Sequence, residues 1–237
     1  MQKPMRTADI LAALSSHEWF NGLPAELRDA ILALGHVRKV CSGELIFAQG
    51  DSCNGLFAVL EGTVRLSGTT AEGKPIMYRM IGAGGWFGHL SALDGGPRVQ
   101  DAHTLQDGHL LHLSRSGFDS LLSEDPARAL HFARLICRDI RISMNMMAEF
   151  QTATITRRIG MMVLEMCNEK VRHNLTDQPL TQETLAAFTG TTRQTVNRIL
   201  RKWERQGLIT IDYGSIRIHD FPAFERFLDE QTDEQRY

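Results

Sequence analysis

A glycine-bounded stretch near the C-terminus carries side chains that could contact nucleic-acid bases. Wound at about 100° per residue, residues 192–205 divide into two faces. One face is apolar and consists of Val196, Ile199, Leu200 and Trp203. The opposite face carries amide and guanidinium groups, from Gln194, Arg198, Arg201 and Arg205. Arginine can bond guanine through two hydrogen bonds and glutamine can do the same with adenine. The pattern predicts a helix that buries one stripe and offers base-binding groups on the other.

Within this helix we expect some side chains to contact bases and others to contact phosphates. Arg193 and Gln194 fall in the first turn, where groove contacts are made, and Arg198 follows one turn later. Lys202 and Arg205 are expected to hold phosphates, which gives affinity without sequence information. The candidate DNA-binding set is Arg193, Gln194, Thr195, Asn197, Arg198, Arg201 and Lys202. The alternative is a protein-interaction helix whose arginines are only solvated.

The flanking residues predict a winged helix-turn-helix. A first helix over about 180–189 ends at Gly190, which allows the tight turn between the helices. Thr191 or Thr192 can cap the second helix, and Gln194, three residues after Thr191, predicts a capping box. After Gly207, the segments LITI and SIRI flank a turn at 212–214, which predicts a hairpin wing.

The part of the chain before this module is predicted to be a glycine-punctuated β region. Short β-prone runs fill residues 37–113, with turn signals every eight to twelve residues, as in an antiparallel barrel or sandwich. Residues 7–35 have helical spacing, and the turn at 21–24 predicts a helix over Ala25–Leu34.

A long helix is predicted at about 126–152. An apolar seam recurs at steps of three and four, at Ile136, Ile140, Ser143, Met147, Phe150 and Thr154. Such a seam favours a parallel helix pair between two subunits, with packing inside one domain as the alternative. A two-fold dimer would place two recognition helices on half-sites of a pseudo-palindromic DNA. A further helix at 153–170 and a polar linker at Val171–Gln178 follow.

Length and composition are those of an ordinary two-domain globular protein. The chain has 237 residues, 43% of them hydrophobic, and a net charge of −2. The charge is uneven, because residues 191–207 hold five Arg or Lys against the single acid Glu204. No signal peptide or apolar run of 18 residues is present, so we expect a cytoplasmic protein that does not enter a membrane. The four scattered cysteines are expected to be reduced thiols.

The order of these parts resembles the cyclic-AMP receptor/FNR (CRP/FNR) family of bacterial transcription regulators. The motifs that carry the resemblance are Gln49-Gly50-Asp51, Leu60-Glu61-Gly62-Thr63-Val64, Trp86-Phe87-Gly88 with Pro97-Arg98, and Thr192-Arg193-Gln194-Thr195-Val196-Asn197-Arg198-Ile199-Leu200. It implies an α+β fold: an antiparallel β-roll like a cyclic-nucleotide-binding jelly roll, a dimerisation helix and a winged helix-turn-helix. The expected limits are 1–125, 126–152 and 153–237. The resemblance also implies base contacts by Arg193, Gln194 and Arg198, and a partner in RNA polymerase. The family often has Glu where this chain has Gln194, and we therefore expect a different preferred base at that position of the DNA site.

The resemblance is weaker where an effector would bind. Family members that bind cyclic nucleotides carry F-G-E-L and P-R-[ST]-A, in which Glu takes the ribose hydroxyl while Arg and the hydroxyl residue hold the phosphate. Here the segments are 87–90, with His89 in place of that Glu, and 97–100, with Val99 in place of the hydroxyl residue. Val99 donates no side-chain hydrogen bond, and only a neutral His89 ring nitrogen could accept one. The candidate effector pocket comprises Gly88, His89, Leu90, Arg98, Val99 and Ser143.

These differences predict a β-roll that senses an effector other than cyclic AMP, or that acts without one. The alternative is a cyclic-AMP-dependent regulator with a variant pocket. His89 suggests a haem or metal ligand, but His103, His109 and His112 provide no paired spacing, so we expect neither. An iron–sulfur cluster is not expected either, because no cysteine precedes Cys41. No nucleophile–base arrangement or phosphate loop points to an enzyme. The alternatives from other classes are a small-molecule-binding protein and a dimeric scaffold, neither of which binds DNA.

Overall fold

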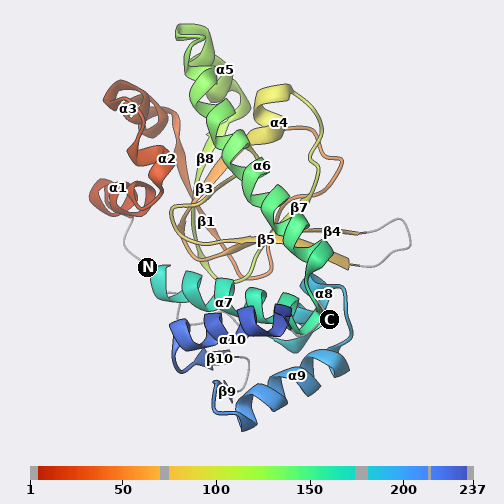
Figure 1. Ribbon diagram of the computed structural model, residues 1–237. Coiled ribbons are helices and arrows are strands. Elements are labelled where there is room, and N and C mark those ends of the chain that lie inside the picture. Colours follow the sequence, from red (N-terminus) through yellow and green to blue (C-terminus); the bar gives the residue numbers. More distant parts are fainter. Residues whose placement is uncertain (1–4, 70–74, 174–180, 213–214, 234–237) are drawn as a thin grey trace. The chain divides into compact units, whose positions relative to one another are not determined.

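Two units make up the computed structural model of the protein (Figure 1). One unit comprises Met1–Gly68 and Tyr78–Arg141, and the other comprises Thr69–Met77 and Ile142–Tyr237. Within them, the structure describes residues 5–69, 75–173, 181–212 and 215–233.

The predicted antiparallel β-roll is confirmed and consists of two four-stranded sheets. The first sheet contains, in order, β1 (His36–Val40), β8 (Gly108–Ser114), β3 (Gly55–Glu61) and β6 (Trp86–Phe87). The second contains β2 (Leu45–Phe47), β7 (Asp101–Thr104), β4 (Val64–Thr69) and β5 (Pro75–Ile81). Neighbouring strands run antiparallel, and Phe57 of β3 pairs with His112 of β8.

Strand β3 separates two apolar cores. Successive side chains of a strand point to opposite faces. Phe57 and Val59 accordingly lie in the core between the sheets, whereas Leu56, Ala58 and Leu60 lie in a second core beneath helices. Because both faces are covered, β3 is buried along almost its whole length.

Short helices cover the outer face of β3. They are α1 (Thr7–Ser15), α2 (Glu18–Asn21), α3 (Ala25–Leu34), α4 (His89–Asp94) and α5 (Arg115–Glu124). The prediction of a helix over Ala25–Leu34 is confirmed. Figure 1 shows α1, α2 and α3 gathered at one side of the roll. Phe20, Phe118 and Phe132 are buried in the shared core, the last of these from the start of α6 (Arg128–Thr152). Helix α6 is therefore fixed to the roll by its first turns.

The outward face of α6 carries an apolar stripe that shares Ile140 and Met147 with the predicted seam. The stripe consists of the exposed side chains of Leu130, Cys137, Ile140, Met144 and Met147 and is called the α6 stripe below. Ile136 is half-buried, and Thr154 lies beyond the end of the helix. The inward anchors Phe132 and Leu135 turn the helix so that Met144 lies outward. The side chain of Phe150 lies outside the described residues.

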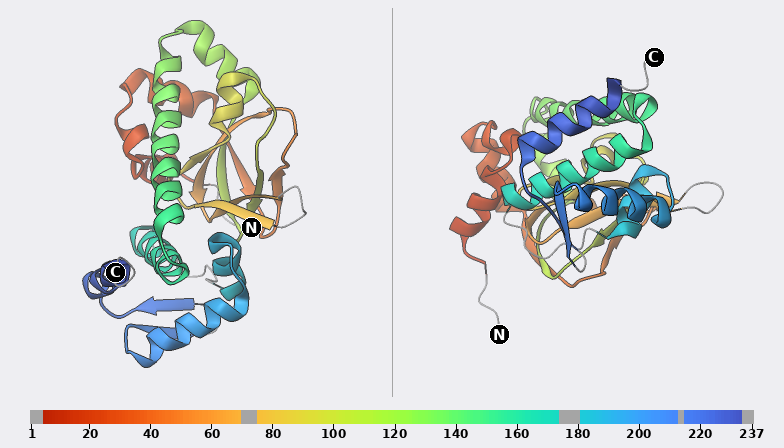
Figure 2. Two further views of the ribbon diagram at one scale, coloured as in Figure 1. Left: turned by 45° about the vertical axis from the view of Figure 1, so that its right-hand side comes forward. Right: turned by 60° about the horizontal axis from the view of Figure 1, so that its bottom comes forward.

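The second unit contains the predicted winged helix-turn-helix. Its elements are α7 (Ile155–His173), α8 (Gln182–Thr189), α9 (Arg193–Arg205), β9 (Ile209–Asp212), β10 (Ser215–Ile218) and α10 (Phe221–Asp233). The hairpin of β9 and β10 is antiparallel and lies beside α9 (Figure 2). The predicted turn at Tyr213-Gly214 lies outside the described residues, as does the predicted linker beyond His173.

Helix α10, which sequence reasoning missed, completes the core of this unit. Trp203 of α9 is fully buried, with its ring edge-on to Phe224 at 5.3 Å and Phe227 at 6.3 Å between centroids. Leu228 of α10 approaches Gly160 of α7 so closely that a Cβ there would lie 2.2 Å from a Leu228 methyl carbon. No described helix of either unit has the length and apolar character that crossing a membrane requires.

Candidate nucleic-acid interface and effector cassette

Helix α9 begins at a threonine cap. Thr192 has extended backbone angles, and its Oγ1 accepts a hydrogen bond of 3.2 Å from the backbone N–H of Thr195. Thr192 is therefore the N-cap, and the third residue of the helix is Thr195. The capping box predicted between Thr191 and Gln194 is wrong, since Gln194 lies one residue too early to reach back to the cap. The side chain of Gln194 is left exposed.

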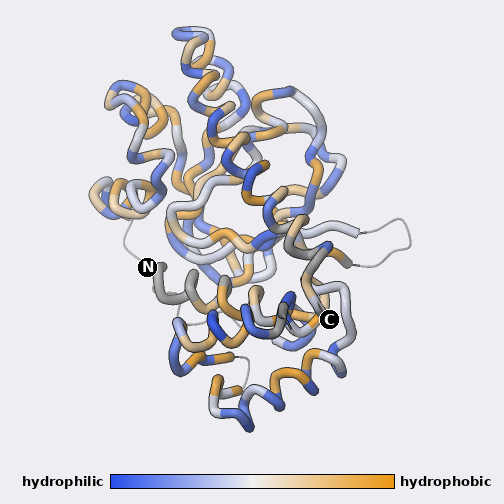
Figure 3. The backbone as a smooth tube through the Cα atoms, viewed as in Figure 1, coloured by the Kyte–Doolittle hydropathy of each residue, from blue (hydrophilic) through white to orange (hydrophobic). Residues whose placement is uncertain are grey.

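The turn before α9 depends on glycine, as predicted. Gly190 ends α8 in the left-handed conformation, with φ of +64°, which glycine adopts at little cost. The turn brings the apolar side of α8, including the fully buried Leu185, against α9. From α9, Val196, Leu200 and Trp203 are fully buried and Ile199 nearly so. In Figure 3 the α9 tube alternates between orange and blue along its length as the two faces succeed each other.

The outer side of α9 presents a polar surface that is called the open face below. Its members are Gln194, Arg198, Arg201, Lys202 and Arg205, and all five are exposed. Arg201 forms an ion pair of 2.7 Å with Glu204, and this pair lowers the pKa of Glu204. Glu204 also accepts from the backbone N–H of Ile211, which ties the helix to the wing. The side chains of Gln194, Arg198 and Lys202 make no hydrogen bond or ion pair with the described residues.

Besides Arg201, three residues of the predicted DNA-binding set are engaged within the module. Arg193 Nη1 lies 2.9 Å from Glu183 Oε1 of α8, although both side chains are exposed. Asn197 is half-buried and donates to Gln182 Oε1 at 3.0 Å. Thr195 is part of the cap. Arg193, Gln194, Asn197 and Gln182 line a shallow hollow at the start of α9.

Sequence reasoning missed Gln182 and Glu183. Their position at the start of α8 could have indicated them, because the turn at Gly190 packs α8 against α9.

In the β-roll, the segments 87–90 and 97–100, where an effector would bind in the family, are called the cassette below, and their arginine is buried and held by the backbone. Arg98 is only 2% exposed, and its guanidinium donates to the carbonyl oxygens of Gly88 at 2.9 Å and Gly55 at 2.6 Å. It also donates to Asn54 Oδ1 and lies over the Phe47 ring, 4.1 Å from the centroid. Burial is the main cause that lowers the pKa of Arg98 from its usual value.

The glycine before α4 makes room for this arginine. Gly88 has φ of +78°, and a Cβ there would lie 2.7 Å from Arg98 Nη1. The glycine of the cassette is thus required by the packing of Arg98, whether or not a ligand binds.

His89 is linked to the long helix through a carboxylate. Its Nε2 lies 3.1 Å from Oδ2 of Asp139 on α6, and Arg79 Nη1 donates to Oδ1 of the same carboxylate at 2.8 Å. Burial alone would raise the pKa of Asp139, but the hydrogen bond from His89 and the charge of Arg79 outweigh it and lower this pKa. His89 is 7% exposed. The side chain that stands where the family has its ribose-binding Glu is therefore buried, and it is already paired with Asp139.

The other residues of the predicted effector pocket are exposed. Leu90 is 39% exposed and Val99 50% exposed, and Ser143 is exposed on the part of α6 that belongs to the second unit. The structure thus brings Gly88, His89 and Arg98 together but leaves Leu90 and Val99 at the surface. Among the described residues, no group of three or more His, Cys, Asp or Glu side chains is placed to hold a metal ion.

Two family models match the chain. The cyclic nucleotide-binding domain matches residues 37–125, and the Crp-like helix-turn-helix domain matches residues 157–227. Together these segments take in more than half of the chain.

Full-length relatives have the same order of parts. The chain is 29% identical to the cyclic AMP receptor protein of Thermus thermophilus over 215 residues, which are 87% of this chain and 94% of that protein. It is 25% identical to the CRP-like cAMP-activated global transcriptional regulator of Mycobacterium tuberculosis over 193 residues, 78% of this chain and 84% of that one. The crystal structure of a CRP-family transcriptional regulator from Thermus thermophilus superimposes with a TM-score of 0.67 at 23% identity, and covers 81% of this chain and 96% of that one.

These relatives are transcription regulators, and the matched domains account for both the β-roll and the helix-turn-helix. The chain therefore belongs to the CRP/FNR family of DNA-binding transcription regulators.

Proposed function

We propose that the protein is a dimeric, sequence-specific transcription regulator that binds a pseudo-palindromic DNA site. The open face of α9 carries this proposal. Its cations and amide lie above a fully buried apolar stripe, so the helix can enter a major groove without exposing its core. Regulators of this kind also contact RNA polymerase, and we expect the same of this chain.

Base contacts are assigned to Arg193, Gln194 and Arg198. Gln194 and Arg198 are free of partners among the described residues, so they can turn to base edges without breaking an internal bond. Arg193 must first leave Glu183, but this exposed pair contributes little stability. Arg201 and Lys202 are assigned to phosphates. Thr195 and Asn197 act by holding the start of α9 and its contact with α8.

The α6 stripe is assigned to the subunit contact. Its five side chains recur at steps of three, four and seven along one helix, which is the spacing of a two-stranded coiled coil. A second copy would cover a row of apolar side chains that a single chain leaves in water. In this proposal residues 1–125 sense, 126–152 dimerise and 153–237 bind DNA.

Arg198→Ala tests the assignment of the open face. We expect the variant to fold normally and to lose its preference for the target duplex over a scrambled duplex. A guanine contact contributes about 1–3 kcal/mol of discrimination for each half-site. The control is Arg226→Ala, which removes an exposed arginine of α10 from the same unit. Unchanged discrimination in Arg198→Ala, measured by fluorescence anisotropy at one salt concentration, would overturn the assignment.

We also propose that the β-roll does not use cyclic AMP in the usual way. The position of the ribose acceptor holds a buried histidine with an internal carboxylate partner, and the phosphate-side hydroxyl is replaced by Val99. A nucleotide would have to displace the Asp139 contact and would still lack two polar partners, each of which contributes about 1–3 kcal/mol. The roll therefore senses another effector or acts without one.

A cyclic-AMP-dependent regulator is the second candidate. It is favoured by the names of the relatives, which include a cyclic AMP receptor protein and a cAMP-activated regulator. Calorimetric titration of the full chain with cyclic AMP and cyclic GMP separates the two candidates. Binding tighter than micromolar that also raises DNA affinity supports the second candidate, whereas binding weaker than millimolar supports the first.

A further inference from the structure

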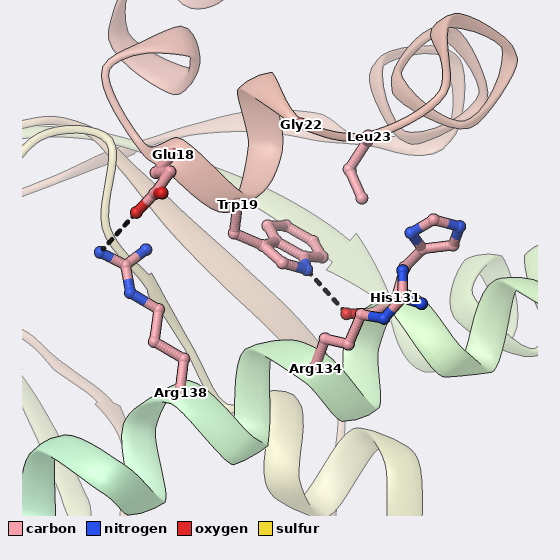
Figure 4. Close-up of a pocket in the computed structure, with 7 residues that line it drawn as sticks. All are labelled: Glu18, Trp19, Gly22, Leu23, His131, Arg134 and Arg138. Atoms are coloured by element: carbon pink, nitrogen blue, oxygen red, sulfur yellow. Dashed lines mark hydrogen bonds and ion pairs between the residues drawn. The ribbon is translucent and has the colours of Figure 1, made fainter.

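A surface pocket in the first unit lies apart from the cassette and is lined by α2, the turn after it, and α6 (Figure 4). Its lining residues are Glu18, Trp19, Gly22, Leu23, His131, Arg134 and Arg138. Arg98 and His89 of the cassette are not among them. The pocket needs its own explanation, because it combines an aromatic ring with cationic side chains from successive turns of one helix.

Trp19 gives the pocket a fixed aromatic wall. Its indole N–H donates to the backbone carbonyl of His131 at 2.7 Å, which holds the ring between α2 and α6. The ring packs against Trp86 and Phe132, with centroids 5.2 and 5.4 Å away. Trp19 nevertheless stays half-buried, and with Leu23 it offers an apolar surface to a planar group.

The two arginines have binding capacity that the described residues do not use. Arg134 is exposed and makes no hydrogen bond or ion pair with them. Arg138 Nη2 lies 3.8 Å from Glu18 Oε2, and the Glu18 side chain is 89% exposed, so this pair is long and well solvated. The lining thus has an excess of positive charge and two guanidinium groups that suit a carboxylate or phosphate.

A neighbouring histidine keeps Arg138 at the pocket. His17 Nε2 lies 3.4 Å from Arg138 Nη1. Burial, aided by the charge of Arg138, lowers the pKa of His17 to about 4, so the imidazole is neutral at pH 7 and can accept a hydrogen bond from the guanidinium. Arg138 is therefore oriented without being neutralised, which leaves its charge available to a ligand.

We propose that this pocket binds a small organic anion, whose carboxylate or phosphate pairs with Arg134 and Arg138 and whose planar apolar part rests on Trp19 and Leu23. The site is independent of the cassette and does not depend on the proposed DNA contacts. Its ligand would join α2 to α6 within the first unit, so binding would stiffen the helical cover of the β-roll.

The test uses the full chain with 5-fluorotryptophan in place of its three tryptophans, and follows each ¹⁹F signal during titration. The probes are phenyl phosphate and benzoate, with benzyl alcohol as the uncharged control. We expect both anions to shift the Trp19 signal in a saturable way, with dissociation constants below about 1 mM, while the signals of buried Trp86 and Trp203 stay in place. Benzyl alcohol should bind at least tenfold more weakly.

Arg134→Gln and Arg138→Gln should each weaken phenyl phosphate binding at least about tenfold, since each removes a charge-assisted contact. Arg141→Gln is the matched control, because Arg141 is exposed one turn further along α6 and does not line the pocket. The proposal is overturned if the Trp19 signal fails to move, if benzyl alcohol binds as well as benzoate, or if the glutamine variants bind like Arg141→Gln. A variant that alters the monomer–dimer equilibrium but not probe binding would assign the arginines to a subunit contact and would also overturn it.

Discussion

The carboxylate of Asp139 is shared by His89 and Arg79, so one side chain joins α4, β5 and α6. Asp139→Asn removes the negative charge and replaces one of the two acceptor oxygens with an amide N–H₂, so the imidazole and the guanidinium cannot both keep an acceptor. We expect the free energy of unfolding to fall by about 1–3 kcal/mol. Urea unfolding followed by tryptophan fluorescence measures this change.

The control for that variant is Asp119→Asn, since Asp119 pairs with Arg115 on an exposed face of α5. Surface pairs of this kind contribute about 0–1 kcal/mol. Equal decreases in the free energy of unfolding of the two variants would mean that the Asp139 contacts are no stronger than an ordinary surface ion pair.

His17 should make the first unit sensitive to mild acid. Its pKa is lowered from 6.5 to about 4, mainly by burial. Above pH 6.5 the imidazole is neutral in the folded and the unfolded chain. As the pH falls from 6.5 toward 4, the unfolded chain binds the proton first, so stability decreases until folded His17 is itself protonated.

We therefore expect the free energy of unfolding to decrease less between pH 7 and pH 5 in His17→Gln than in the unchanged protein. The glutamine can still accept a hydrogen bond from Arg138. Thermal unfolding at several pH values measures the slope. Identical slopes for the two proteins would contradict the assignment of this acid sensitivity to His17.

Individual contacts divide into those that a sequence pattern predicts and those that it does not. The open face of α9 was predicted in large part, because helical periodicity places Gln194, Arg198 and Arg201 opposite a buried stripe. The partner of His89 was not, because Asp139 lies 50 residues away in sequence and only the packing of α6 brings it near. The same holds for Trp19 and Arg138, whose meeting depends on how α2 folds against α6.

Helix α6 leaves its apolar stripe exposed, and the proposed dimer would cover it. Ile140 lies in the middle of the stripe and is 51% exposed. Ile140→Asp places a charge there without disturbing the inward anchors Phe132 and Leu135, so the fold should persist while the dimer dissociates. Sedimentation equilibrium at micromolar concentration should show dimer for the unchanged protein and monomer for the variant.

Asn145→Asp introduces the same charge on α6 at an exposed position outside the stripe, and should leave the dimer intact. If both variants remain dimeric, the subunit contact lies elsewhere.

The elements themselves followed from local pattern more closely than their packing did. Glycine spacing and β-prone runs predicted an antiparallel barrel or sandwich, and the family resemblance specified a β-roll. The limits of α3, α6 and α9 lie within about two residues of those expected. For α6 the pattern left the exact face open, because a seam at steps of three and four fits several faces of a long helix. Ile140 and Met147 of the predicted seam are exposed, whereas Ile136 is half-buried and Thr154 lies beyond the helix. Only the packing of Phe132 and Leu135 in the core determines which face of α6 turns inward. Sequence reasoning missed α10 altogether, although its buried Phe224 and Leu228 have helical spacing.

For the molecule as a whole, a near-neutral net charge and a local basic face predict DNA binding that covers a short stretch of DNA and weakens as salt is added. Lys202→Ala should weaken binding to target and scrambled duplexes alike, because phosphate contacts carry no sequence information. The slope of log affinity against log salt should decrease by about two for a dimer, one for each copy. Anisotropy titrations at several salt concentrations measure this slope. A loss confined to the target duplex would instead assign Lys202 to a base.

Arg98 serves the architecture of the β-roll before it serves any ligand. Its guanidinium fastens the backbone at Gly55 to the backbone at Gly88, and the Gly88 left-handed turn exists to admit it. Selection for folding alone would therefore preserve the Gly-and-Arg signature in a descendant that had lost its nucleotide. The glycine and the arginine therefore do not by themselves indicate a bound nucleotide in this chain, and any choice of effector depends on the side chains around them, such as His89 and Val99.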